Sequence, residues 1–135
     1  MRRRTLLLLL ATPVVRSDDT ALRERCLARL REGLQAHDTD FWPAMHAAEA
    51  LTQAGLGAEV TAALTPLQGT VTDDRQRCGV ARELARAGDM AKTAVLWQIL
   101  QSPADHGHVH AAESLFKAGW ERQADPVPLR RALVQ

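Results

Sequence analysis

Apolar positions along this chain follow the three-to-four-residue spacing of amphipathic helices, and one stretch of the pattern occurs three times. Each copy is nine residues long and ends in Ala-Gly, and the copies cover residues 47–55, 80–88 and 111–119. Their closing glycines lie 33 and then 31 residues apart. A period in this range, with a second apolar segment after each copy, is typical of helical repeats that bury their apolar faces against one another. The pattern predicts an all-α protein, a short right-handed α-solenoid of about three helix-turn-helix repeats.

One further helix is expected ahead of the repeats. Asp18 or Asp19 can cap its start, and Gly33 lies near its end. Its apolar positions at helical spacing are Leu22, Cys26, Leu27, Leu30 and Leu34. Because these residues form one stripe, we expect the helix to cap the N-terminal end of the solenoid.

Capping residues and glycines set the boundaries of the repeat helices. Asp73, with Gln76 three residues later, has the spacing of a capping box, and glycine commonly follows a helix C-terminus. Asp125 places a cap before a proline at the first helical position. The six repeat helices are expected over residues 41–55, 58–67, 73–88, 89–101, 105–119 and from 125 onward, which makes seven helices with the capping helix.

The first 17 residues have the composition of a signal peptide. Residues 2–4 are all arginine, an apolar core of about ten residues follows, and the chain then turns polar. A membrane-spanning helix needs roughly 20 apolar residues, so this segment is too short for an anchor. We expect residues 1–17 to be removed and residues 18–135 to be exported, to the periplasm or outside the cell. The alternative is a disordered basic tail on a cytosolic protein, since an Ala-x-Ala site is missing and Pro13 interrupts the core.

Charge and composition narrow the classes of function. The chain has 17 basic and 16 acidic residues, and removal of the four arginines in residues 1–17 leaves 13 basic against 16 acidic, a net charge of about −3. That balance lacks the basic patch that nucleic acid requires. With no Tyr, two Phe and three Trp, the composition favours close-packed helices over a β fold. We therefore expect neither a nucleic-acid partner nor a membrane span.

The repeated phrases resemble a known kind of repeat. His-Ala-Ala-Glu-Ala-Leu at residues 46–51 and His-Ala-Ala-Glu-Ser-Leu at residues 110–115, each closed by Ala-Gly, look like the short HEAT-like repeats of the phycobilisome-lyase type. The resemblance covers about residues 40–133 and implies a protein-interaction scaffold. The lyases themselves attach chromophores, but nothing in this chain beyond the repeat indicates that role, so we expect neither a cofactor nor catalysis. Ankyrin repeats share the period, and Thr65-Pro66-Leu67 is similar to their opening, but Gly69 follows where they continue as a helix. Tetratricopeptide repeats need aromatic positions that this chain lacks.

Alignment of the repeats on their closing glycines brings three charged residues to one position. Glu49, Arg82 and Glu113 each stand six residues before the glycine. Equivalent positions are neighbours in stacked repeats, so these residues are expected to alternate in charge as a structural ladder that fixes register. An exposed pair of this kind contributes about 0.2 to 1 kcal/mol.

The second helices of the repeats are expected to line the concave face, where such scaffolds bind. In the second repeat, Met90 and Trp97 are seven residues apart and share a helix face. Tryptophan is a frequent hot-spot residue at interfaces, which makes Trp97, with Met90, the predicted protein contact; the alternative is a place in the core. At the C-terminal end, Leu129, Leu133 and Val134 leave an apolar surface that could pair two copies of the chain, or continue into further repeats.

Histidines raise a second hypothesis, a metal site. Asp105, His106 and His108 could hold a metal at a helix start if the segment is extended, since alternate residues then point the same way. The alternative is a polar loop in which Asp105 caps the third repeat. The His-x-x-Glu pairs at His46 and His110 are separated by a whole repeat, about two helix-packing distances of 8 to 10 Å each, which is too far for one metal.

Cys26 and Cys78 are the two cysteines, and a pair in an exported protein could form a disulfide. One repeat separates them, whereas a bridge needs Cα atoms within about 7 Å. We interpret both as small core residues. Two hypotheses of function remain: an exported scaffold that binds another protein through its concave face, and a metal-binding accessory protein or small enzyme that uses residues 105–110.

Overall fold

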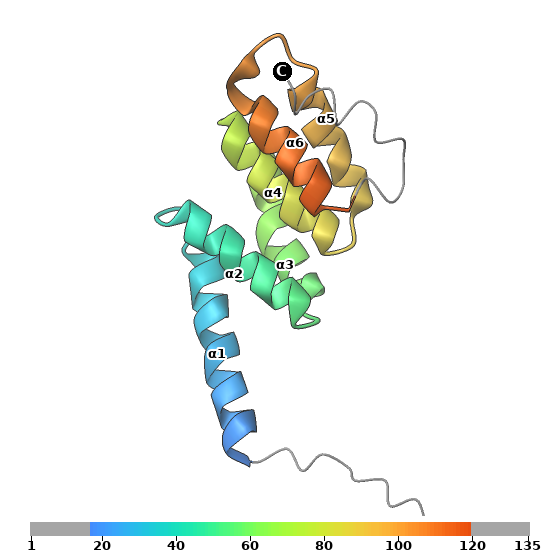
Figure 1. Cartoon of the computed structure of the whole chain (residues 1–135). Coiled ribbons are helices and arrows are strands. Elements are labelled where there is room, and N and C mark those ends of the chain that lie inside the picture. Colours follow the sequence, from blue (N-terminus) through green and yellow to red (C-terminus); the bar gives the residue numbers. More distant parts are fainter. Residues whose placement is uncertain (1–16, 120–135) are drawn as a thin grey trace, which may run out of the picture.

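A computed structural model describes residues 17–119 of the chain (Figure 1). Six α-helices and three short 3-10 helices make up this part, and it contains no strand, so the all-α prediction is confirmed. The α-helices are α1 (Ser17–Gln35), α2 (Phe41–Gln53), α3 (Gly57–Leu64), α4 (Asp74–Arg86), α5 (Thr93–Leu100) and α6 (His108–Lys117). The 3-10 helices are η1 (Thr65–Gly69), η2 (Met90–Lys92) and η3 (Asp105–Gly107). Residues 1–16 of the predicted signal peptide (residues 1–17) and the helix expected from residue 125 lie outside the described residues, while Ser17 begins α1.

The three Ala-Gly phrases end α2, α4 and α6 in the same way. Gly55, Gly88 and Gly119 have φ angles of 85°, 122° and 76°, a region that favours glycine. At the end of α2, the Gly55 N–H donates to Thr52 O at 3.0 Å and the next N–H donates to Leu51 O at 2.9 Å. The end of α4 repeats both bonds. These are the two bonds of a Schellman motif, so the repeated phrase encodes one helix-stop geometry.

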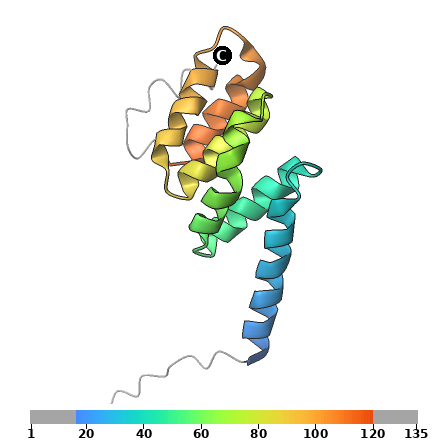
Figure 2. The ribbon, with the colours of Figure 1, turned by 180° about the vertical axis from the view of Figure 1, so that it is seen from behind.

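The central helix of the described chain is α4. It contacts α2 and α3 on one side and α5 and α6 on the other. Every residue of α4 from Cys78 to Ala85 is buried, including two charged ones. Val80 and Leu84 belong to a core shared with α1, α2 and α3, whereas Cys78 and Ala81 belong to a second core shared with α5 and α6. The two cores therefore meet through α4, which Figure 2 shows from behind.

The first helix packs on the body only through its C-terminal half. Leu27 and Leu34 are buried, and Arg31 donates two hydrogen bonds to Glu59 of α3, at 2.7 and 2.9 Å. The N-terminal half extends past α2, as Figure 1 shows, so Leu22 is 53% exposed and Cys26 is also exposed. The prediction that both lie on a buried stripe is wrong, because α2 is 13 residues long and α1 is 19.

Two predicted boundaries need correction. The helix expected over residues 58–67 changes from α to 3-10 geometry at Thr65, where Pro66 occupies the first turn of η1. Asp105 does not cap the third repeat; η3 follows Ala104, and α6 begins at His108 without a side-chain cap. By contrast, Asp73 caps α4 as predicted, since its Oδ1 accepts from the Gln76 N–H at 3.0 Å. Among the described helices, none has the length and apolar character of a membrane span.

Candidate functional site

A narrow cleft lies between η1 and α5, above α4. Apolar side chains form its floor and both walls, and two polar residues stand beside them. The lining residues are Leu67, Gln68, Val71, Arg77, Val80, Ala81 and Val95. The cleft has a volume of about 50 Å³. Pockets for small molecules usually measure about 300 to 1,000 Å³, so this cleft suits the end of one apolar side chain.

The polar edge of the cleft is fixed by an ion pair. Arg77 donates to Asp74 Oδ1 at 2.6 Å, one turn earlier on α4, and both side chains are partly exposed. The pair holds the guanidinium beside the apolar walls, where it remains in contact with water. Protein interfaces in general combine an apolar centre with a polar rim.

The predicted contact residues lie elsewhere. Trp97 is partly buried against the second core, and neither it nor Met90 lines the cleft. The prediction that Met90 and Trp97 share a face depends on one continuous helix from residue 89 to 101. In the structure Met90 lies in η2 and Trp97 in α5, so the change from 3-10 to α geometry between them alters the angular relation.

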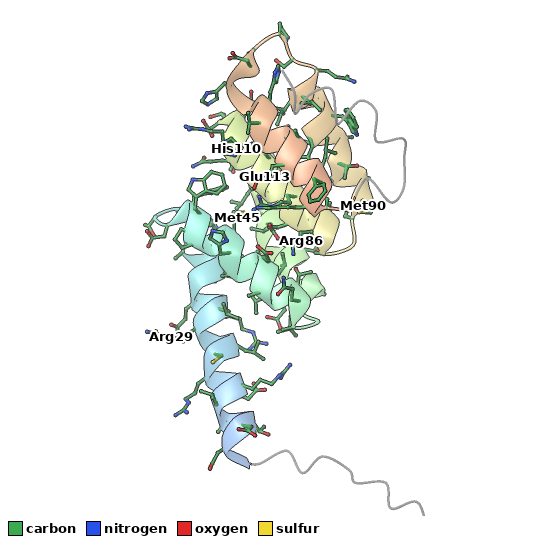
Figure 3. The ribbon with its side chains drawn as sticks, viewed as in Figure 1. Arg29, Met45, Arg86, Met90, His110 and Glu113 are labelled. Carbon is green, nitrogen blue, oxygen red and sulfur yellow. The ribbon has the colours of Figure 1, made fainter. Side chains whose placement is uncertain are left out.

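The three ladder residues lie on α2, α4 and α6 in turn, and Figure 3 labels Glu113 of α6 together with Arg86 of α4. The direct partner of Glu49 is Arg86, at 2.8 Å, one turn beyond Arg82. Glu113 pairs with Lys117 of its own helix at 2.7 Å. The Arg86 hydrogen bond lowers the pKa of Glu49, and the Lys117 hydrogen bond lowers the pKa of Glu113, with the charge of Arg82 adding a smaller effect on both carboxyls. Arg82 thus lies near both acids and bonds directly to neither.

Arg82 donates a hydrogen bond to Glu83, its neighbour in sequence. The Nε to Oε1 distance is 2.6 Å, and the side chains are 9% and 0% exposed. Burial raises the pKa of Glu83, although Arg82 opposes this effect. The second carboxyl oxygen of Glu83, and the hydroxyl of Thr52 on the neighbouring α2, are buried with no hydrogen-bond partner in the structure. A proton on Glu83 would make its carboxyl neutral and able to donate.

Glycine at residue 79 has a packing reason. It occupies the place that His46 and His110 hold in the other repeats, and a Cβ there would lie 3.3 Å from atoms of both Phe41 and Trp42. The rings of Phe41 and Trp42 meet edge to face with their centroids 5.0 Å apart. The Trp42 ring also stacks on the His110 ring, with a centroid distance of 6.1 Å. The second repeat therefore lacks histidine because the aromatic start of α2 covers that position.

The histidines near residue 105 do not converge. Residues 105–107 form η3 and α6 follows, so the extended segment assumed for a metal site is absent. His106 Nε2 lies 3.1 Å from Asp73 Oδ2, and His108 Nε2 lies 2.8 Å from the Ser102 carbonyl oxygen. Within residues 17–119, no group of three or more His, Cys, Asp or Glu side chains could hold a metal ion.

Both cysteines are free thiols. Cys78 belongs to the second core as predicted, with its sulfur 4.0 Å from the Gly107 carbonyl oxygen. Burial raises the pKa of its thiol to about 12. The core interpretation of Cys26 is wrong, because that residue is exposed on the projecting half of α1. Leu129, Leu133 and Val134, predicted to pair two copies, lie outside the described residues.

The sequence interpretation missed the walls of the cleft. The sequence places Leu67 at the end of the helix predicted over residues 58–67 and Val71 in the connection after it, whereas in the structure Leu67 lies in η1 and Val71 follows η1. The signal available was the run Thr65-Pro66-Leu67 with Gly69, which departs from a helical pattern between two repeats. Comparison of the chain with models of protein families, with curated proteins and with solved structures finds no match.

Proposed function

We propose that this protein is an exported scaffold built as a right-handed α-solenoid of HEAT-like repeats, with α1 as its N-terminal cap. Its proposed function is to bind another protein, and it catalyses no reaction. The repeated helix-stop geometry and the burial of α4 between its neighbours on both sides support the repeat architecture. The basic and apolar composition of residues 1–17 supports export.

The cleft above α4 carries the proposal for binding. It lies between η1, which continues the second helix of the first repeat, and α5, the second helix of the next. The second helices of such repeats line the concave face. A side chain of a bound protein, with an apolar end and a length that reaches the α4 floor at Val80 and Ala81, would fill the volume of about 50 Å³. Arg77 and Gln68 would meet the polar backbone or side chains around it.

A capture experiment with two tryptophan variants tests this function. The full chain, tagged and made in its own host, is used as bait for exported proteins. Gln68→Trp fills the cleft, and Leu22→Trp places the same side chain on the exposed half of α1 as a matched control. The proposal predicts that wild type and Leu22→Trp capture the same protein and that Gln68→Trp loses it while keeping the thermal melting curve of a folded protein. Capture that Gln68→Trp leaves unchanged would rule out the cleft.

The alternative is a metal-binding accessory protein or small enzyme that uses Asp105, His106 and His108. The contacts of His106 with Asp73 and of His108 with the Ser102 carbonyl favour the scaffold, because a metal would have to displace both. Calorimetric titration of the full chain with zinc or nickel separates the two. Binding heat that His106→Ala abolishes would favour the alternative.

A further inference from the structure

A polar groove adjoins the cleft. It lies between two segments that each lead into a repeat, the turn from α1 to α2 and the connection from η1 to α4. Leu67 and Val71 line both the groove and the cleft, so the two hollows meet at these side chains. The groove has a volume of about 410 Å³, which is in the range of ligand pockets. It therefore offers space beside the cleft for more than one side chain.

Threonine hydroxyls supply hydrogen-bonding groups along the groove. Thr39 donates to the Ala36 carbonyl oxygen at 3.1 Å, and Thr70 donates to the Leu67 carbonyl oxygen at 3.2 Å. Each hydroxyl has one proton and two lone pairs, so both oxygens can still accept a hydrogen bond. Thr72 also lines the groove, and within the described residues its hydroxyl has no partner. The groove can thus accept several N–H groups from a ligand.

The side-chain amide of Gln76 is free in the same groove. In a capping box this amide would accept from the backbone N–H of Asp73. The structure contains only the first half of the box, the bond from the Gln76 N–H to Asp73 Oδ1 at 3.0 Å. Within residues 17–119 the Gln76 amide has no partner, although the residue is partly buried. Gln68, at the edge of the cleft, has a free amide as well.

Groups of this kind match an extended peptide backbone. A glutamine amide both donates and accepts, and each residue of an extended chain presents one N–H and one C=O. A helix bonds these groups internally and offers none of them to a groove. Charge gives no support to an anionic ligand, because neither Arg nor Lys lines the groove. Its one carboxylate, on Asp38, lies 3.0 Å from the His37 Nδ1.

We propose that the groove binds an extended segment of the partner protein through its backbone, and that this segment places one apolar side chain in the cleft. The inference rests on the proposed function, because the cleft supplies the side-chain contact. The Gln76 amide bonds the N–H and C=O of one partner residue, and the threonine oxygens accept from neighbouring N–H groups. Such binding restricts the partner sequence only at the residue that enters the cleft.

NMR titration of the isotope-labelled full chain with a short peptide tests the inference. The probe is acetyl-Thr-Thr-Leu-Thr-Thr-amide, since β-branched residues favour an extended backbone and the leucine can enter the cleft. We expect the backbone amide signals of Leu67, Val71 and Gln76 to shift, with a dissociation constant on the order of 1 mM. No shift of these signals at about 10 mM peptide would overturn the inference.

Removal of the backbone contact is the sharper test. Gln76→Ala should weaken peptide binding about five- to tenfold, the size expected when two hydrogen bonds are lost. Gln53→Ala is the matched control, because Gln53 is exposed at the end of α2 and does not line the groove, and it should leave binding unchanged. A peptide N-methylated at its leucine and the flanking threonines keeps its side chains and loses backbone donors. It should bind wild type more weakly and show a smaller further loss with Gln76→Ala.

The cleft is tested separately from the groove. Glycine in place of the peptide leucine, and Gln68→Trp in the protein, each remove the side-chain contact and should also weaken binding. If these two changes weaken binding while N-methylation and Gln76→Ala do not, the cleft binds as proposed and the inference about the groove is overturned. Equal losses on N-methylation in wild type and in Gln76→Ala would overturn it too.

Other occupants of the groove give different results. An alanine-rich helical peptide with a single leucine offers the same side chain without free backbone groups. Binding of this peptide as tightly as the extended one would overturn the inference. Groove signals that shift on dilution of the full chain without peptide would show a second copy in the groove, which contradicts the inference as well.

Discussion

The most unusual residues in this protein are Arg82 and Glu83, adjacent in sequence and both buried in the middle of α4. A buried ion pair costs free energy because both charges leave water, and the cost is offset only when each is well bonded. Arg82 donates to one oxygen of Glu83, while the other oxygen has no partner in the structure. The carboxyl of Glu83 is therefore the less completely hydrogen-bonded group of the pair.

Stability should fall as pH rises through the folded pKa of Glu83. Burial raises this pKa above its ordinary value of 4.5, so the folded state binds a proton more tightly than the unfolded state. The stability linked to this proton is fully present below the unfolded pKa and is lost as pH rises through the higher folded pKa. Urea unfolding measured at several pH values should show this slope in wild type.

Glu83→Gln should remove that slope. The amide keeps an oxygen for Arg82 and gains a donor for the position that now lacks a partner. We expect its free energy of unfolding at neutral pH to equal or exceed that of wild type. Glu83→Ala, which leaves Arg82 buried alone, should lose about 3 to 5 kcal/mol. Equal losses in the two variants would contradict this account of the carboxyl.

The two cysteines should differ in reactivity. Cys26 is exposed on α1, and the Cys78 thiol is buried with a pKa of about 12. The thiolate is the reactive form, so a thiol reagent at neutral pH should modify Cys26 at once and Cys78 only after unfolding. Mass spectrometry of the labelled folded protein measures this, with Cys26→Ser as the control. Rapid labelling of folded Cys26→Ser would show that α4 is not packed as described.

At the scale of the elements, the sequence predicted where the first helix of each repeat ends better than it predicted which side chains are buried. A glycine in the repeated phrase specifies a left-handed backbone, which is a local property and can be inferred from the chain alone. Whether Leu22 and Cys26 are covered depends on the length of α2 and the direction in which α1 crosses it. The cleft depends on the break at Pro66, where one helix geometry changes to another. Such features arise from tertiary packing.

Gly88→Ala should destabilise the protein. Gly88 has a φ of 122°, and a side chain in the left-handed region costs about 1 to 2 kcal/mol. Gly69→Ala is the matched control, because a Cβ there would meet nothing within 4 Å and its φ is not in the positive region. It should be neutral or slightly stabilising. The comparison uses urea unfolding, and equal stability of the two variants would contradict the helix-stop interpretation.

Gly107→Ala should loosen the contact between α6 and α4. A Cβ on Gly107 would lie 2.6 Å from a methyl carbon of Ile99 and 2.8 Å from the Asp74 Cβ, too close without movement. Overpacking of this kind costs about 1 to 3 kcal/mol. Denaturant unfolding should show the loss. Near-ultraviolet circular dichroism should change as well, since the position of Trp42 on His110 depends on where α6 docks.

At the scale of the whole molecule, the described helices form a frame in which α4 is packed on both sides by its neighbours. The projecting half of α1 is one end of that frame, and α4 is its middle. Binding of another protein is proposed for the cleft above α4.

Hydrogen exchange of the full chain, followed residue by residue, tests the central claim that the repeats stack about α4. The amides of α4 should exchange most slowly, those of α2 and α6 at intermediate rates, and those of residues 20–26 in α1 fastest, because protection follows burial and contact with neighbours. Equal protection of α4 and the projecting half of α1 would contradict the stacked-repeat account.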